Sequence, residues 1–298
     1  MGTTTTSRLD AFLTGLISMD LPLGSDLLHS RAEDAFTLCI TLIADAAYCE
    51  KVGTELHRLA AKAAGFAGWM AFNNGNHPIA ESRYQTAIHL AEMSGAVDLK
   101  TYYTMDFAHQ QSAIGRPVMA LELLSTVASD VRRGRTSART AAAVHAISAE
   151  AHAILGDSAA HTKAIEAARA ALEHDTTPQT FTPNSWVTAP VIELEAGYSL
   201  LRLGKPRQAL PHFEVLNNGA FPSEQWPREA AIHLVYAAKA RLGAGDVEAA
   251  VAYARRAHDF LDRVSSTRAS QRVACLRRAL SVHQRTPAVR DYLDRPMT

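Results

Sequence analysis

Small and apolar residues recur at fixed distances from a series of glycines along most of the chain. These glycines are Gly75, Gly115, Gly156, Gly204 and Gly245, and by subtraction their spacings are 40, 41, 48 and 41 residues. Seven residues before each of them stands a small residue: Gly68, Ala108, Ala149, Gly197 and Ala238. Nine residues after each of them stands an apolar residue: Tyr84, Leu124, Ile165, Phe213 and Ala254. A period of this length is typical of a stack of similar helical units.

Each unit has the features of two helices joined by a tight turn. Gly75 suits the end of a helix, because glycine adopts a positive φ without steric strain. Pro78 suits the first turn of the next helix, where its missing N–H costs no hydrogen bond. The small residue before each turn lets paired helices approach closely, so we expect Gly68 and Gly197 at helix crossings. The sequence therefore predicts an all-α fold of antiparallel helix pairs around one continuous core.

The spacing small–x6–Gly–x4–Ala–x3–Tyr/Phe resembles the tetratricopeptide (TPR) repeat, with units longer than the usual length of about 34 residues. The alanines of this pattern are Ala80, Ala120, Ala209 and Ala250, and His161 replaces the alanine in the third unit. Four stretches are also similar to the TPR region of actinobacterial helix-turn-helix regulators of the XRE family: 59–77, 109–117, 240–251 and 263–268. The resemblance covers roughly Asp26 to Arg295 and implies a TPR-like right-handed α-solenoid.

The expected organisation is a flexible tip and a short N-terminal helix within residues 1–25, followed by a single TPR-like repeat domain over 26–298. The apolar residues of the short helix lie between Leu9 and Met19. In the regulators that the chain resembles, a DNA-binding domain precedes the repeats. The residues before Asp26 are too few for such a domain. The resemblance therefore implies the sensor part of such a regulator, without DNA binding of its own.

Charge and hydropathy narrow the range of partners. The chain has 30 Lys and Arg against 30 Asp and Glu, and this balance argues against nucleic-acid binding. Arginines are frequent from Arg255 to Arg295, where they form either solvated helix faces or a patch for a partner. No apolar run approaches the roughly 20 residues that cross a bilayer, and the start lacks the features of a signal peptide. We expect neither nucleic acid nor membrane as a partner, and the oligomeric state stays open.

The cysteines do not form a recognisable framework. Cys39, Cys49 and Cys275 are odd in number, and no two of them have the C-x-x-C spacing. We expect buried, reduced thiols in a cytoplasmic protein, with no metal site and no cofactor.

Two connectors interrupt the period. The stretch 174–190 holds three X-Pro steps with Phe181 and Trp186, and it accounts for the spacing of 48 residues. The stretch 221–227 is a second proline-rich segment, with Phe221 and Trp226. Each is either a packed connector that covers the edge of the core or a lid over the concave groove of the solenoid.

No specific catalytic signature is present in the sequence. His145 and His152 are seven residues apart on one predicted helix, about 10 Å along its axis, too far for one metal without further ligands. The repeat instead predicts a concave face. Six residues before each turn glycine stand Trp69, His109, Glu150, Tyr198 and Lys239, and further concave candidates are Asn73, Tyr102 and Met105. With Trp186 from the connector, these side chains are candidates for binding a small molecule or a peptide.

Two functions follow from this candidate site. The first is a ligand- or peptide-binding regulatory protein that also contacts another protein. The second is a metal-independent enzyme of specialised metabolism, with His109 and Glu150 as acid and base and Lys239 as electrophile. A deep enclosed cavity where His109 and Glu150 converge favours the enzyme, and an open groove with separated polar groups favours binding. The alternative that these side chains only fill or solvate the groove also stays open.

Overall fold

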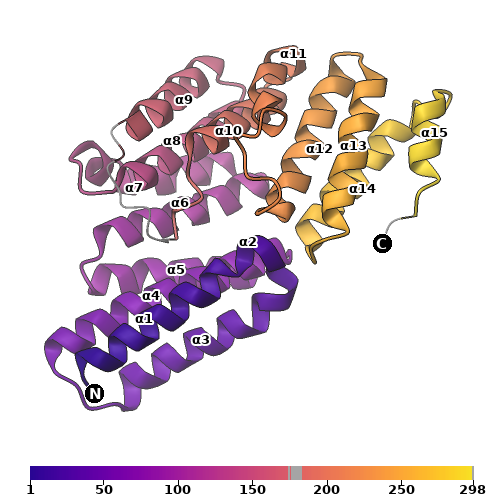
Figure 1. Ribbon diagram of the computed structural model, residues 1–298. Coiled ribbons are helices and arrows are strands. Elements are labelled where there is room, and N and C mark those ends of the chain that lie inside the picture. Colours follow the sequence, from indigo (N-terminus) through magenta and orange to yellow (C-terminus); the bar gives the residue numbers. More distant parts are fainter. Residues whose placement is uncertain (174, 176–182, 297–298) are drawn as a thin grey trace.

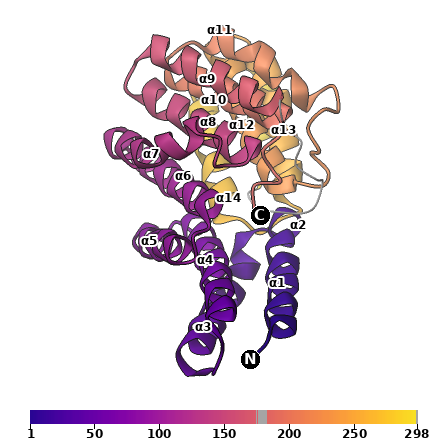
Figure 2. The ribbon, with the colours of Figure 1, turned by 90° about the vertical axis from the view of Figure 1, so that its left-hand side faces the viewer.

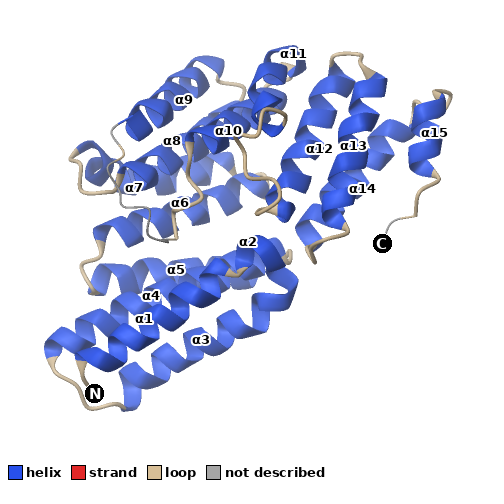
Figure 3. Cartoon of the chain, in the orientation of Figure 1, coloured by secondary structure: helices blue, strands red, loops and turns tan. Residues whose placement is uncertain are grey.

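The computed structural model describes residues 1–173, 175 and 183–296, and within these residues the chain is helical and contains no strand (Figure 1, Figure 3). The helices are α1 (Thr3–Ser18), α2 (Asp20–Leu23), α3 (Ser25–Asp45), α4 (Glu50–Asn73), α5 (His77–Met93), α6 (Val97–Ala113), α7 (Pro117–Arg132), α8 (Ala138–Ile154), α9 (Ser158–Glu173), α10 (Ala189–Arg202), α11 (Pro206–Ala209), the 3-10 helix η1 (Leu210–Leu216), α12 (Pro227–Gly243), α13 (Val247–Leu261), α14 (Thr267–Ser281) and α15 (Pro287–Leu293). Helices adjacent in sequence pack as pairs. The predicted all-α fold of helix pairs is confirmed.

The turn glycines lie where the repeat pattern places them. Their φ angles are +76° at Gly75, +82° at Gly115, +80° at Gly156, +70° at Gly204 and +92° at Gly245. At the first turn, the N–H of Gly75 bonds the carbonyl of Phe72 and the N–H of Asn76 bonds that of Ala71. These are the two hydrogen bonds of a Schellman motif, which requires a residue with positive φ. Glycine at these positions therefore ends one helix without strain and turns the chain back.

The small residues before the turns lie at the helix crossings, as expected. A Cβ atom added at Gly68 on α4 would come within 3.0 Å of the Tyr84 ring on α5. A Cβ atom at Gly197 on α10 would come within 3.0 Å of the Phe213 ring in η1. Both aromatic partners stand nine residues after a turn glycine, so two columns of the sequence pattern form one packing contact.

The first and second helices of a pair differ in burial. Buried residues of α8 lie on several of its faces, whereas those of α9 are His161, Ile165 and Ala168, all on one face. The helices α4, α6, α8, α10 and α12 pack against each other in this order. They form the inner layer of a curved array, and α5, α7, α9 and α13 cover it from outside (Figure 1).

The N-terminal segment differs from the expectation of a flexible tip. Helix α1 begins at Thr3, and it packs along α4 with Leu9 and Leu13 buried. The ammonium group of Lys62 on α4 lies 2.9 Å from Asp10 and 2.6 Å from Thr14. These contacts hold α1 against α4. The threonine-rich start is tied down separately, because Thr6 is buried and the N-terminal ammonium group donates to the Ala47 carbonyl.

The segment around α2 contacts α12 and the start of α14, which lie far from it in the sequence. Asp20 in α2 forms an ion pair with Arg228 in α12, 208 positions later in the sequence. The Asp26 carboxylate accepts hydrogen bonds from Ser265 and Thr267 at the start of α14. Figure 2 shows α2 beside the C-terminal helices. The curved array is therefore closed on one side by its own N-terminal segment.

Several arginines of the C-terminal segment form contacts within the chain. Arg263 pairs with Glu224 at 2.7 Å, and Arg295 pairs with Asp259 at 2.7 Å. Arg277 donates to the carbonyls of Tyr292 and Leu293. Of the two readings of this segment, these contacts favour charged faces that hold the last helices together.

The three cysteines differ in their exposure to solvent. Cys39 is buried, but Cys49 and Cys275 are exposed, so the expectation of three buried thiols is wrong. Cys49 lies in the turn before α4, and Cys275 lies on the face of α14 that turns away from the core. None of the described helices is long and apolar enough to cross a bilayer.

Candidate functional site

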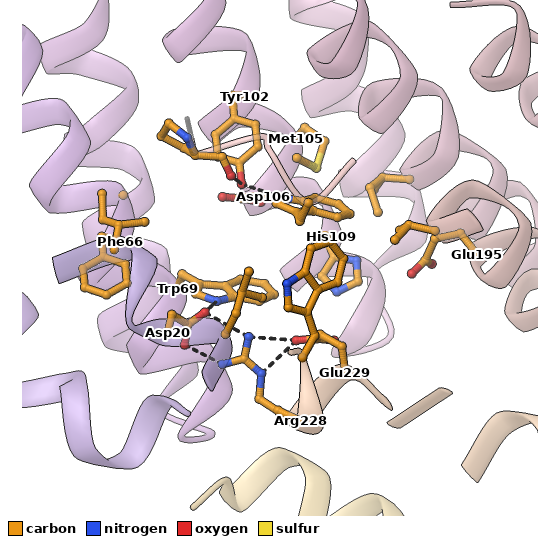
Figure 4. A pocket seen from close by; sticks show the side chains of 18 of the residues that line it. Asp20, Phe66, Trp69, Tyr102, Met105, Asp106, His109, Glu195, Arg228 and Glu229 are labelled. Carbon is orange, nitrogen blue, oxygen red and sulfur yellow. Dashed lines mark hydrogen bonds and ion pairs between the residues drawn. The ribbon is translucent and has the colours of Figure 1, made fainter. Parts of the chain in front are cut away.

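The inner helices surround a cavity of about 130 Å³, measured as the space open to the centre of a water molecule. An engineered protein cavity of about 150 Å³ holds benzene, so this space is large enough for a small organic molecule. Figure 4 shows the cavity with many of its side chains. Its lining comprises Ile17, Asp20 and Leu21 of α1 and α2; Gly65, Phe66 and Trp69 of α4; Tyr102, Tyr103, Met105, Asp106 and His109 of α6; Ile147 of α8; Pro183 and Trp186; Val191 and Glu195 of α10; Phe221 and Trp226; Arg228, Glu229 and His233 of α12; and Arg268 of α14.

Aromatic rings form much of the wall. All three tryptophans of the chain, Trp69, Trp186 and Trp226, line the cavity. The indole N–H of Trp186 donates to the Tyr102 hydroxyl at 2.9 Å, and this hydroxyl donates to the Pro183 carbonyl at 2.9 Å. The first connector is thereby fixed to α6.

Both connectors contribute to the cavity wall. Trp186 and Pro183 come from the first connector, and Phe221 and Trp226 come from the second. Phe221 and Trp226 also pack edge to face, with ring centroids 5.6 Å apart. Phe181, which the sequence also singled out, lies outside the described residues. The described parts of both connectors therefore line the cavity, as the lid hypothesis expects.

A buried ion cluster closes one end of the cavity. We call Asp20, Arg228 and Glu229 the Arg228 cluster. Arg228 is 1% exposed, and its guanidinium donates to both carboxylate oxygens of Asp20 and to Glu229 at 2.8 Å (Figure 4). The Trp69 indole N–H also donates to Asp20 at 2.8 Å. Burial alone would raise the pKa of Glu229, but the charges of Arg228 and of its neighbours lower it to about 2. Every charge of this cluster thus has a partner.

A second polar chain runs beside Trp69. Arg268 donates to the Asn73 side-chain oxygen at 3.2 Å and to Nε2 of His109 at 3.3 Å. Because a guanidinium can only donate, Nε2 accepts and the proton of the neutral ring lies on Nδ1. Nδ1 then donates to Glu150 at 3.1 Å. Burial alone would raise the pKa of Glu150, but His109, Arg268 and Arg202 lower it.

Two carboxyl groups of the cavity have no such partner. Asp106 on α6 is only 5% exposed, and Glu195 on α10 is largely buried. Within the described residues neither side chain has a hydrogen-bond or ion-pair partner. Burial raises the pKa of Asp106 well above its ordinary value. Burial, and then the negative charge of Glu150, raise the pKa of Glu195 to about 8. The Glu195 carboxyl group is therefore mostly protonated and uncharged near neutral pH, and burial favours the uncharged form of Asp106 as well.

The structure brings part of the predicted site together. Trp69, Tyr102, Met105, His109 and Trp186 line the cavity. Glu150 contacts His109 from behind and is not part of the lining.

Tyr198 and Lys239 do not reach the cavity. The Tyr198 ring stacks on Tyr236 with centroids 4.3 Å apart. Lys239 lies farther along the inner layer, where burial and the charge of Arg272 lower its pKa. The expectation of one continuous groove along the whole column is therefore not met. The physical reason is the curvature of the chain, which brings α2 and α14 onto the concave side and limits the cavity to the first part of the column.

The residues that the sequence reasoning missed belong mostly to another column of the same repeat. Nine residues before the first four turn glycines stand Phe66, Asp106, Ile147 and Glu195, and all four line the cavity, whereas Tyr236 before the fifth does not. This column lies about one helical turn before the column of Trp69, on a similar face of each inner helix. A carboxylate at two of these inward positions was the available signal. The Arg228 cluster had no comparable signal, because its members are distant in sequence.

The remaining histidines add no metal site to this description. His145 and His152 are half-buried on α8. Among the described residues no group of three His, Cys, Asp or Glu side chains is placed to hold a metal ion. Neither a protein-family model nor a curated protein sequence matches the chain.

Proposed function

We propose that this protein is a regulatory protein that binds a small organic molecule in its central cavity. It has a TPR-like, right-handed solenoid like the sensor part of the XRE-family regulators that the sequence resembles. It acts in the cytoplasm, and three cysteines without a disulfide fit a reducing compartment. The observation that carries the proposal is the aromatic cavity with two unpaired carboxyl groups.

The composition of the cavity wall supports ligand binding. Small-molecule sites are concave, mostly apolar and provided with a few polar groups that orient the ligand. Here Phe66, Tyr102 and Trp186 supply apolar surface, while Asp106 and Glu195 supply polar groups. A carboxyl group buried without a partner is costly for the fold and is frequent at functional sites.

The position of the cavity supports a regulatory role. Its lining combines α2 from the N-terminal segment with α12 and α14 from the C-terminal part. A ligand that contacts all three stabilises the closed arrangement of the two ends, by its differential affinity for that arrangement. A partner protein that contacts both ends then distinguishes the bound from the free form. The limited volume and the presence of Arg268 on the concave side favour a small molecule over a peptide.

The enzyme is the second candidate, because His109 and Glu150 converge at the wall of a partly enclosed cavity. Nε2 of His109, however, already accepts a hydrogen bond from Arg268. The pair is therefore less available as a base than an acid–base pair open to the cavity. Recovery of an identified ligand unaltered after long incubation with the protein supports binding, and its recovery as a new compound supports the enzyme.

The tryptophans provide a direct test of ligand binding. Since all three line the cavity, the intrinsic fluorescence of the protein reports on this site alone. We would titrate the protein with benzylamine, benzyl alcohol and benzoate, which share one ring and differ in charge. At least one of them is expected to give a saturable fluorescence change.

Matched variants locate this change. Ile147→Phe adds volume inside the cavity and is expected to abolish the saturable change. Ile154→Phe makes the same substitution near the end of α8, away from the lining, and is expected to preserve it. Absence of any saturable change in the unaltered protein, or an equal change in both variants, would contradict the proposed function.

A further inference from the structure

We propose that the cavity selects an organic ammonium ion, held by the unpaired carboxyl groups of Asp106 and Glu195 and by the aromatic rings around them. This inference rests on the proposed function and specifies the chemistry of its ligand.

The basic groups of the cavity are partly occupied. The Arg228 guanidinium bonds the carboxylates of Asp20 and Glu229, so an anionic ligand would have to displace one of them. The Arg268 guanidinium bonds the neutral side chains of Asn73 and His109 and lies over the Phe72 ring at 4.9 Å. Among its described residues the cavity therefore holds one guanidinium without a carboxylate partner, against two carboxyl groups without a cationic partner. The excess favours a cation, and benzoate tests the competing preference for an anion.

The acidic groups remain unbalanced. The lining contains four carboxyl groups, Asp20, Asp106, Glu195 and Glu229, and two guanidinium groups, Arg228 and Arg268. With all of them ionised, the sum is two minus four, a net charge of −2. Asp106 and Glu195 account for this excess, because the other two carboxylates pair with Arg228. A positive charge between α6 and α10 would supply the missing partner.

The positions of the two carboxyl groups suit one ligand. Asp106 and Glu195 occupy the same column of the repeat, on either side of Ile147 on α8. Helix α8 packs between α6 and α10. Figure 4 shows Glu195 apart from the hydrogen-bond network of Arg228. A molecule that lies over Ile147 thus has a carboxyl group on either side, and neither of the two belongs to the Arg228 cluster.

The aromatic rings add a second attraction for a cation. An ammonium group over an aromatic face is attracted by the ring quadrupole, more strongly when it is removed from water. Arg228 and Arg268 already lie 5.7 and 5.8 Å from the Trp69 ring centroid, so this wall accepts positive charge. Within the described chain no such cation lies over Tyr102 or Trp186. These rings face the same space as Asp106.

The titration of the carboxyl groups is consistent with such a ligand. Burial raises the pKa of both Asp106 and Glu195 and so favours their uncharged forms. The groups that act on Glu195 are Glu150 and Glu229, which raise its pKa, and Arg268, which lowers it. A bound cation favours the ionised form of both carboxyl groups.

The charge series of benzylamine, benzyl alcohol and benzoate tests this inference at pH 8. We expect benzylamine to bind at least about tenfold more tightly than benzyl alcohol, because only the amine can pair with a buried carboxylate. Benzoate should bind more weakly than both. The double variant Asp106→Asn/Glu195→Gln should lose the preference for benzylamine and still bind benzyl alcohol, which shows that its cavity is intact.

A control variant and the contrary outcomes complete the test. Glu166→Gln removes an exposed carboxylate from α9 and should keep the preference for benzylamine. Equal or tighter binding of benzyl alcohol than of benzylamine by the unaltered protein would overturn the inference on ammonium ions and leave the proposed function standing. A preference that survives in the double variant would also overturn it. Failure of all three probes to bind would contradict both the inference and the proposed function.

Discussion

Two glutamates of the same cavity have opposite properties. Glu229 on α12 bonds the Arg228 guanidinium, and its pKa is lowered to about 2. Glu195 on α10 has no partner within the described residues, and its pKa is raised to about 8. Both side chains are removed from most of the solvent. The difference therefore comes from the partner and not from the depth of burial.

The comparison separates structural charge from functional charge. Asp20 and Glu229 with Arg228 join the N-terminal segment to α12, so these charges contribute to closing the array. Asp106 and Glu195 form no hydrogen bond or ion pair within the described residues, so their charge does not stabilise the fold. A buried acid that is unused by the fold is available to a ligand, and this distinction can be tested by substitution.

Arg228→Leu should have the largest effect on stability. It leaves Asp20 and Glu229 buried without their partner, and loss of one member of a buried ion pair costs about 3–5 kcal/mol. Chemical denaturation followed by circular dichroism would measure the change in the free energy of unfolding.

Arg241→Leu is the matched control on the same helix. Arg241 is more exposed, and its ion-pair distances of 3.5 and 3.8 Å are long. Its replacement should change the free energy of unfolding by less than about 1 kcal/mol. Equal losses for the two variants would contradict the special role of the Arg228 cluster.

The unpaired acids should make stability depend on pH above 6.5. The folded Glu195 side chain keeps its proton up to about pH 8, while an unfolded glutamate has lost it above roughly pH 4.3. The native state thus binds more protons, and the free energy of unfolding falls as pH rises through this range, by at most about 1.4 kcal/mol per pH unit for this group. Asp106, whose pKa is also raised, acts with the same sign. Denaturation curves between pH 6.5 and 8 would show the slope.

Buried histidines contribute to the slope with the opposite sign. Burial lowers the pKa of His233 to about 4, and it also lowers the pKa values of His77, His145, His161 and His258. Because an unfolded histidine still binds protons up to roughly pH 7.5, these groups raise the free energy of unfolding as pH rises to that value. The contribution of Glu195 is therefore the difference in slope between the unaltered protein and a variant that leaves the histidines unchanged. Glu195→Gln should reduce the slope above pH 6.5. Glu193→Gln on the same helix should leave it unchanged, because Glu193 pairs with Arg169 and its pKa is lowered. An unaltered slope in Glu195→Gln would show that this carboxyl group is ionised in the folded protein.

The smallest effect is expected for Asp106→Asn, and it has a close control in Asp20→Asn. The same chemical change removes an unpaired carboxyl group in the first variant and a member of the Arg228 cluster in the second. At pH 7 we expect Asp106→Asn to alter the free energy of unfolding by less than about 1 kcal/mol and Asp20→Asn to lower it by more than about 2 kcal/mol. Thermal unfolding of the two variants side by side would decide, and a reversed order would contradict the division into paired and unpaired acids.

The sequence predicts the helix pairs well because their determinants are local. Gly75 at a turn and Gly68 against Tyr84 depend on backbone conformation and on spacing within one unit. The sequence does not predict that α1 begins as early as Thr3, because this start depends on the burial of Thr6 and on the hydrogen bond from the N-terminal ammonium group to the Ala47 carbonyl. Contacts between segments that are distant in the sequence do not appear as a periodic pattern of residues.

The site could be predicted only in part for the same reason. The repeat places Trp69 and His109 on the inner face, and its column nine residues before the turn glycines places Asp106 and Glu195 there as well. It cannot show that Arg228 meets Asp20, since that contact depends on the curvature of the whole array. The same curvature separates Lys239 from the cavity.

The most direct test of the central claim is a crystal structure of the protein with benzylamine. We expect the ring to lie beside Tyr102 and Trp186 and the ammonium nitrogen to lie about 3 Å from a carboxylate oxygen of Asp106 or Glu195. The Arg228 cluster should keep its hydrogen bonds in the complex. An empty cavity in crystals soaked at saturating benzylamine, or an ammonium group that points away from both carboxyl groups, would contradict it.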